Sequence, residues 1–277
     1  MITFKENEPY SPIKYVYEVD NILYKGKSQF QELLVFESPD FGRVLALDNI
    51  IQLTERDEFF YHEMLTHIAM HTHPNAERVI VIGGGDGGTM REVLKHDSVK
   101  KAYLVEIDKK VVDVSREFLP FVSSKLDDPR VEIHYEDGAE FIKKIKDIDV
   151  VIVDSTDAIG MARALYSEEF FKNIYNCLSE DGLYVTHSES LLFHREMTIE
   201  VQNTLKKVFP IVNLYSFAIA TYPGNWWSFA IGSKKYDPRT PNKPPVKNTK
   251  IYDEEVHAWV FLPKKLFNRI MNKEVKW

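Results

Sequence analysis

The chain of 277 residues contains a single cysteine, Cys177, and no long apolar run. One cysteine cannot form an internal disulfide, and it excludes a metal site built from several thiolates. Cys177 falls in a segment with helical spacing, so we expect it in the core. No apolar stretch approaches the roughly 20 residues of a membrane helix, and no cationic-then-apolar leader opens the sequence. We therefore expect a soluble, cytoplasmic protein without a membrane partner.

Basic residues are fewer than acidic ones, with 35 Lys and Arg against 42 Asp and Glu and a net charge of −7. No basic patch is interleaved with aromatic residues, so we expect no nucleic-acid partner. An acidic balance is compatible with cationic substrates, although it is ordinary among cytosolic proteins.

The hydrophobic pattern changes near residue 57. Residues 1–56 alternate apolar and polar positions in short pieces, which predicts a small N-terminal antiparallel β-domain. Residues 57–277 begin with a helix and then alternate apolar strands with amphipathic helices, which predicts an α/β domain with a doubly wound, mostly parallel sheet. Two late strands separated by a few residues around Pro223 should pair as an antiparallel hairpin. The Pro- and Lys-rich residues 236–250 indicate an extended, solvated surface loop.

Most informative is the segment that joins the apolar residues 79–82 to a helix through five glycines and Asp86. Glycines permit a sharp turn and let a ligand approach main-chain amides. Asp86 would repel an anion and attract an amine, so the loop predicts a positively charged ligand. Glycine-rich turns occur in many nucleotide binders, and this one alone is weak support.

Each predicted parallel strand is followed by an acid, and the ends of such strands meet at the ligand-binding edge of the sheet. These acids are Asp86, Glu106 with Asp108, Asp137, Asp154 with Asp157, and Glu189. A rim of negative charge is repulsive unless cations neutralise it, so a cationic ligand is the simplest explanation. For Asp108 a turn or helix cap is the favoured interpretation.

Some of these acids have more specific interpretations. Glu106 lies about twenty residues after the glycine loop, where an acid holds ribose hydroxyls. Asp137, followed by Gly138, is equally an adenine contact or a helix cap. Asp154 leaves a strand of four apolar residues, and the resulting desolvation raises a carboxyl pKa and suits it to accept a proton.

With these motifs in order, the sequence resembles the polyamine aminopropyltransferases, of which spermidine synthase is typical. The resemblance rests on YHEM, the glycine loop, LVEID, YEDGAEF, DSTD and TYP, and it runs from FQELLVFES to EEVHAWVFLP. It implies a Rossmann-like domain of the class I methyltransferase type after the β-domain. It also implies transfer of the aminopropyl group of decarboxylated S-adenosylmethionine to putrescine, by a homo-oligomer that is a dimer or tetramer.

The resemblance also assigns roles. Asp154 and Tyr61 would be catalytic, deprotonating the amine. The donor would bind to Gln31, His62, Gly83, Gly85, Asp86, Glu106, Asp137, Gly138 and Asp154. The acceptor would bind to Tyr61, Asp154, Asp157, Glu189 and Tyr222. Neither a metal nor a bound cofactor is expected, because the donor is a co-substrate.

Three alternatives stay open. Ala158 and Met161 stand where the family usually has prolines that fix φ, so spermidine, agmatine or cadaverine could replace putrescine. A class I methyltransferase using intact S-adenosylmethionine is the second alternative, and a non-catalytic adenosyl- or polyamine-binding regulator is the third. His67, His71 and His73 are expected to be solvated or to cap a helix rather than bind metal.

Overall fold

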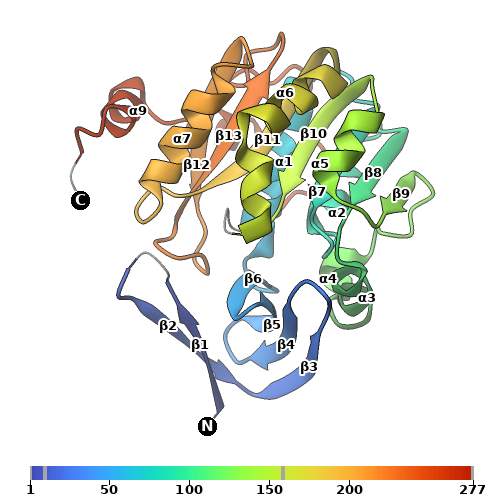
Figure 1. Ribbon diagram of the computed structural model, residues 1–277, viewed down its shortest axis with the longest axis vertical. Helices are drawn as coiled ribbons and strands as arrows, with labels where there is room; N and C mark the ends of the chain where they lie inside the picture. The colour runs from blue at the N-terminus through green and yellow to red at the C-terminus, as the bar shows by residue number, and fades with distance from the viewer. Residues whose placement is uncertain (1, 9–10, 157–159, 276–277) are drawn as a thin grey trace.

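A seven-stranded sheet organises most of the chain (Figure 1). The computed structural model describes residues 2–8, 11–156 and 160–275. The strand order is β12-β13-β11-β10-β7-β8-β9, and β13 runs antiparallel to both neighbours. The strands are β7 (Arg78–Gly83), β8 (Lys101–Val105), β9 (Val131–His134), β10 (Ile148–Asp154), β11 (Leu178–Ser190), β12 (Ile211–Ala218) and β13 (Trp226–Ser233). The predicted doubly wound sheet and its late antiparallel hairpin are confirmed.

Helices cover both faces of this sheet, because alternate strand residues point to opposite sides. Val79 and Val81 pack toward α1 and α2, whereas Ile80 and Ile82 pack toward α5, α6 and α7. The helices are α1 (Glu58–Thr72), α2 (Gly88–Val93), α3 (Lys109–Phe118), α4 (Pro120–Ser123), α5 (Gly138–Phe141), α6 (Glu168–Cys177), α7 (Arg195–Leu205), α8 (Glu254–Trp259) and α9 (Lys264–Met271), with 3-10 turns η1 (Ile142–Lys144) and η2 (Gly160–Tyr166). Cys177 is buried, as predicted.

The N-terminal residues form two antiparallel sheets below the central one (Figure 1). One is a hairpin of β1 (Ile2–Asn7) and β2 (Lys14–Val19); the other contains β3 (Asn21–Lys27), β4 (Glu32–Ser38), β5 (Gly42–Leu47) and β6 (Ile50–Thr54). The four-stranded sheet shares an apolar core with α3. The short alternating pieces that predict strands here are residues 13–19, 30–38, 43–48 and 49–55, so β1 and β3 were not predicted. In β3, Ile22 is 52% exposed and a register shift follows it, so the alternation that marks a half-buried strand is missing.

The central sheet changes winding direction between β7 and β10, the place where ligands bind in folds of this kind. Gly83, at the end of β7, pairs with Asp154, at the end of β10. Gly83 has a φ of +78°, and a Cβ built there would lie 2.1 Å from the Asp154 carbonyl oxygen. The two strand ends therefore approach this closely only because residue 83 has no side chain.

Residues 236–250 form the extended surface segment that was predicted, with nearly all of them exposed or half-buried, but their backbone also makes hydrogen bonds to α1 that were not predicted. The backbone N–H of Val246 donates to His71 Nε2 at 3.1 Å, and the N–H of Lys250 donates to Glu63 Oε1 at 2.6 Å. The physical reason is that α1 is buried on nearly all sides and carries polar side chains. These side chains need hydrogen-bond partners, which the segment supplies.

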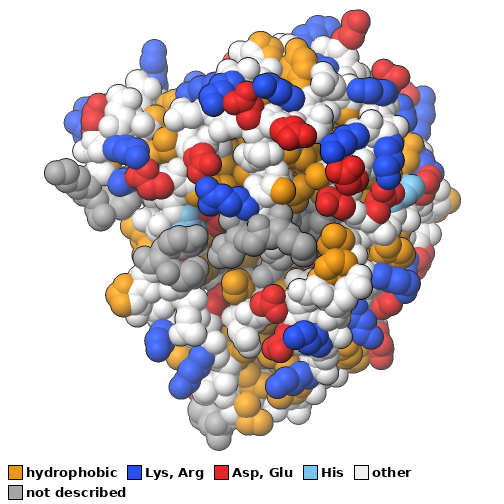
Figure 2. All heavy atoms as spheres, viewed as in Figure 1, with side chains coloured by type: hydrophobic (Ala, Val, Ile, Leu, Met, Phe, Trp, Pro, Cys, Tyr) orange, Lys and Arg blue, Asp and Glu red, His pale blue; other side chains and the backbone are white. Residues whose placement is uncertain are grey.

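Charged side chains of both signs are interspersed on the face shown in Figure 2, so neither sign dominates it. Within the described parts of the chain, none of the helices has the length and apolar character to cross a membrane.

We predict that Gly83→Ala lowers the free energy of unfolding by about 3 kcal/mol, because the new Cβ combines a left-handed backbone with a clash against the main chain of residue 154. Urea denaturation measures this. Gly26→Ala is the matched control, since its Cβ meets only the movable end of the Tyr24 side chain and should change stability by less than about 1 kcal/mol. Equal effects of the two variants would contradict the argument.

Candidate active site

Two predicted acids, Asp86 and Asp154, meet at the crevice between β7 and β10. A carboxylate oxygen of each lies with a ring nitrogen of His62 in a group whose atoms are all within 4.8 Å of one another. Asp154 is 9% exposed, and it accepts hydrogen bonds from the Tyr61 hydroxyl at 2.8 Å and the Thr89 hydroxyl at 2.6 Å. The fold thus brings together residues from α1, β10 and the loop that opens α2.

This environment determines the proton affinity of Asp154. Burial raises its pKa above the ordinary value, and the nearby charge of Asp86 raises it further. Burial and the carboxylate of Asp154 likewise raise the pKa of Tyr61, which therefore stays a neutral hydroxyl that donates to Asp154. A buried carboxylate with a raised pKa and a fixed hydroxyl donor is suited to accept a proton from a bound ligand.

Asp86 behaves differently, although it lies beside Asp154. Burial would raise its pKa, but the hydrogen bond and charge of His62 lower it. Its Oδ1 is 3.4 Å from His62 Nε2 and accepts from the backbone N–H of Gly88 at 2.8 Å. Its pKa is therefore lowered although it lies beside Asp154, so Asp86 stays ionised.

Glu106 lies at the end of β8, against the glycine loop. Its carboxylate accepts from the backbone N–H of Asp108 at 2.8 Å and of Gly85 at 3.2 Å. Burial raises the pKa of Glu106 to about 7, despite these bonds. Gln31 reaches the same place from the N-terminal sheet by donating to Asp108 Oδ2 at 2.9 Å. Asp108 caps α3 through the N–H of Lys110, as expected.

Asp137 is an exposed helix cap, since it accepts from the N–H of Ala139 at 2.7 Å at the start of α5. Gly138 packs on Ile82, where a Cβ would lie 2.3 Å from a methyl carbon. The cap interpretation is thus confirmed, whereas an adenine contact stays a prediction.

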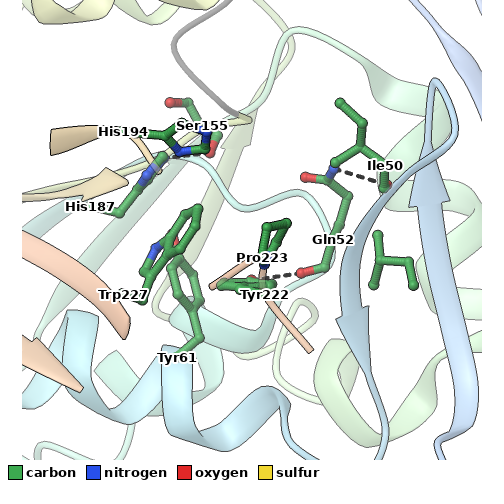
Figure 3. Close-up of a pocket in the computed structure, with 10 residues that line it drawn as sticks. Ile50, Gln52, Tyr61, Ser155, His187, His194, Tyr222, Pro223 and Trp227 are labelled. Carbon is green, nitrogen blue, oxygen red and sulfur yellow. Dashed lines mark hydrogen bonds between the residues drawn. The ribbon is translucent and has the colours of Figure 1, made fainter. Parts of the chain in front are cut away.

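A pocket opens next to Tyr61 (Figure 3). Three aromatic residues, Tyr61, Tyr222 and Trp227, stand on one side of it, and Ile50 and Gln52 from β6 face them. The ring centroids of Tyr61 and Tyr222 are 5.5 Å apart in an edge-on arrangement. The Tyr222 hydroxyl donates to the main-chain carbonyl of Gln52 at 2.7 Å. Such walls accept the apolar part of a ligand.

Glu189 marks the other end of this region. It lies at an irregular point of β11, with a φ of +68°, which is uncommon for a residue with a side chain. Its Oε2 is 3.3 Å from His194 Nδ1, and His194 Nε2 is 3.0 Å from Oε1 of Glu8, on the chain just after β1. His194 lines the pocket and joins two buried carboxylates.

Several site residues were not predicted, namely Glu8, Gln52, Asp57, Thr89, His187 and His194. Thr89 could have been identified from the sequence, because it directly follows the glycine loop. Asp57 accepts from the Thr54 hydroxyl at 2.7 Å and the N–H of Thr221 at 2.9 Å, and so holds the segment that carries Tyr222. No local pattern links residues this distant in sequence.

Asp157 and Ala158 lie outside the described residues, as does the side chain of Met161.

The expectation that the histidines of α1 are solvated is wrong, since His67 and His71 are fully buried. His67 lies 3.0 Å from both His96 Nε2 and Glu92 Oε2, and His71 Nδ1 donates to the His67 carbonyl at 2.9 Å. His73 is the residue at the C-terminal end of α1, as a cap should be. Hydrogen bonds join these side chains, and the absence of a metal stays a prediction.

Comparison with known proteins identifies the family. A profile described as the spermine/spermidine synthase domain matches residues 58–243, and one described as the spermidine synthase tetramerisation domain matches residues 2–55. The chain belongs to the spermine/spermidine synthase family. Polyamine aminopropyltransferase 1 of Aquifex aeolicus is 50% identical over 277 residues, which are 100% of this chain and 99% of that protein. The polyamine aminopropyltransferase of Hydrogenobaculum sp. is similar to the same extent.

Solved structures agree with this membership of the spermine/spermidine synthase family. A spermidine synthase in complex with the transition-state analogue AdoDATO superposes with a TM-score of 0.92 at 39% identity, covering 98% of this chain and 95% of that one. The spermidine synthase of Thermotoga maritima gives a TM-score of 0.89 at 38% identity, covering 98% and 94%. The chain is thus an enzyme of the polyamine aminopropyltransferase type, and the predicted Rossmann-like, methyltransferase-like fold is confirmed.

Burial of Glu106 predicts a pH-dependent cost to stability. Its pKa is about 7 in the folded protein against 4.5 ordinarily, so its ionised form destabilises the fold as pH rises through this window. The parent should lose stability between about pH 5 and about pH 8, whereas Glu106→Gln should not. The difference in unfolding free energy between the two proteins should therefore grow by about 2 kcal/mol in favour of the variant over this range. The exposed Glu117→Gln is the control. Parallel pH profiles for the parent and Glu106→Gln would refute the assignment.

Proposed function

We propose that this enzyme transfers the aminopropyl group of decarboxylated S-adenosylmethionine to putrescine, giving spermidine and 5′-methylthioadenosine. The observation that carries the proposal is the pair of Asp86 and Asp154 beside an aromatic pocket, with His62 Nε2 3.4 Å from Asp86 and the Tyr61 hydroxyl donating to Asp154. The similarity to a spermidine synthase that binds AdoDATO supports it.

The charge of the crevice favours this donor. Intact S-adenosylmethionine would direct a carboxylate toward Asp86 and Asp154, whereas the decarboxylated form offers an ammonium. In our proposal the nucleoside lies along Gln31, Gly83, Gly85, Glu106, Asp137 and Gly138, with its sulfonium end toward His62. The aminopropyl ammonium is then held by Asp86 and Asp154.

The reaction needs an uncharged amine, yet an alkylamine with a pKa of roughly 10.4 is almost entirely protonated at neutral pH. Asp154, assisted by Tyr61, takes a proton from the acceptor's ammonium. The freed lone pair attacks the carbon next to sulfur, a C–N bond forms, and the C–S bond breaks with its electrons going to sulfur. Because the sulfonium leaves as a neutral thioether, the chain contributes chiefly alignment and proton removal.

The pocket supports a diamine acceptor. In our proposal its methylene chain lies between Tyr61, Tyr222 and Trp227, and its distal ammonium approaches Glu189, with Asp157 as a further contact. Glu8 and His194 then complete the distal end. Spermidine, agmatine and cadaverine carry a second cationic group as well, so they are the competing acceptors.

We also propose that the enzyme is a homo-oligomer, a dimer or tetramer, because residues 2–55 match a tetramerisation domain.

Replacing the proposed base should separate catalysis from binding. We expect Asp154→Asn to lower turnover about 100- to 10,000-fold while the protein still binds 5′-methylthioadenosine. The assay follows methylthioadenosine release from the decarboxylated donor and putrescine, and the exposed Asp127→Asn is the control. Turnover within a few-fold of the parent would remove Asp154 from this role.

The same assay on the parent enzyme separates the alternative functions. Methyl transfer from intact S-adenosylmethionine would favour a methyltransferase, and no product from either donor would favour a binding protein.

Glu189→Gln tests the acceptor site. A lost charged contact should lower kcat/KM for putrescine about 10- to 100-fold, but leave the KM for the donor unchanged. Butylamine lacks the distal ammonium, so its use should be unaffected, and Glu196→Gln, which is exposed, is the control. An equal loss for both amines would show that Glu189 does not recognise the second cation.

A further inference from the structure

Behind Asp86 stands a row of buried groups with alternating charge. His62 Nε2 is 3.4 Å from Asp86 Oδ1, and its Nδ1 is 2.6 Å from Glu58 Oε2. Arg91 then holds both oxygens of Glu58, at 3.0 and 2.8 Å. His62 and Glu58 are 2% and 3% exposed, so salt and water screen these charges weakly.

The row determines which nitrogen of His62 can change its protonation. An ionised carboxylate only accepts hydrogen bonds, and the bidentate Arg91 keeps Glu58 ionised. Burial would raise the pKa of Glu58, but its bonds to His62 and Arg91 lower it. The Nδ1 proton is therefore committed to Glu58, and the proton on Nε2, facing Asp86, is the one that can leave.

The imidazole ring has little freedom to turn. It lies on Gly88, where a Cβ would be 2.3 Å from a ring carbon. The ring thus presents Nε2 to Asp86 because residue 88 has no side chain and because Glu58 holds the opposite edge.

A positive charge on His62 would repel a cationic ligand bound at Asp86. Burial disfavours the imidazolium, but Asp86 and Glu58 outweigh it and raise the pKa of His62 to about 10. The groups that face the ring are Asp86 and Asp154 at the strand ends, Glu58 and Tyr61 on α1, and, through Glu58, Arg91 on α2. An ammonium bound at Asp86 would face a second positive charge at Nε2, with little solvent between them.

We propose that binding of the donor's ammonium at Asp86 expels the Nε2 proton of His62, and that Glu58 and Arg91 are positioning residues that make this possible. The proton goes to solvent, and the neutral Nε2 then accepts a hydrogen bond from the ammonium, which keeps its own three protons. This inference rests on the proposed function, because it needs a donor with a cationic arm.

Calorimetry can count the proton. Decarboxylated S-adenosylmethionine is titrated into the whole enzyme without acceptor, near pH 8, in phosphate and in Tris, whose ionisation enthalpies differ. The difference in apparent enthalpy gives the protons released, and we expect about one per site. 5′-Methylthioadenosine, which lacks the aminopropyl arm, should bind with almost no release.

Variants make the test specific to this row. In Glu58→Gln the pKa of His62 should fall, so the ring is already largely neutral near pH 8 and release should drop toward zero. The exposed Glu117→Gln should release as much as the parent. His62→Gln cannot titrate, so it serves even where the Glu58 variant does not fold, and it should also abolish release.

Two results would overturn the inference while leaving the proposed function intact. One is methylthioadenosine formation by an enzyme that binds the donor without releasing a proton. The other is equal release with the donor and with methylthioadenosine. If the decarboxylated donor neither binds nor reacts, the proposed function and this inference fail together.

Discussion

The close approach of two carboxylates in a desolvated crevice is the constraint on which the rest of the site depends. Asp86 and Asp154 can lie this near each other because β7 and β10 are adjacent parallel strands and Gly83 lets their ends meet. Two like charges out of water repel strongly. The fold responds by raising the proton affinity of one and pairing the other with His62.

Helix α1 supplies most of the side chains that offset the repulsion between these two carboxylates. Tyr61 and His62 face the crevice, whereas Glu63 and His71 bind the backbone of residues 246–252 on the other side. A helix buried all round is expected to be apolar. This one carries acids, histidines and a tyrosine, and each has a partner supplied by a distant part of the chain. Its polar side chains thus tie the C-terminal segment and the site to the same element.

The N-terminal sheets contribute at both ends of the site. Gln31 reaches Asp108 beside Glu106, and Glu8 reaches His194 beyond the aromatic pocket. Tyr15 accepts a hydrogen bond from the N–H of Gly224, next to Tyr222. These contacts place the small sheets where they border the proposed donor and acceptor regions, which explains why the site depends on residues far from the glycine loop.

Sequence periodicity alone was sufficient for the doubly wound sheet, the late hairpin and the acids at the strand ends, because burial on both faces gives strands a local apolar signature and parallel strands place their ends at one edge. It did not reveal β3, whose side chains are largely solvated, or Glu8, Asp57 and His194. It also misjudged the burial of His67 and His71. These residues interact with partners distant along the chain, and only tertiary packing decides which polar groups lose water and which partners they then find.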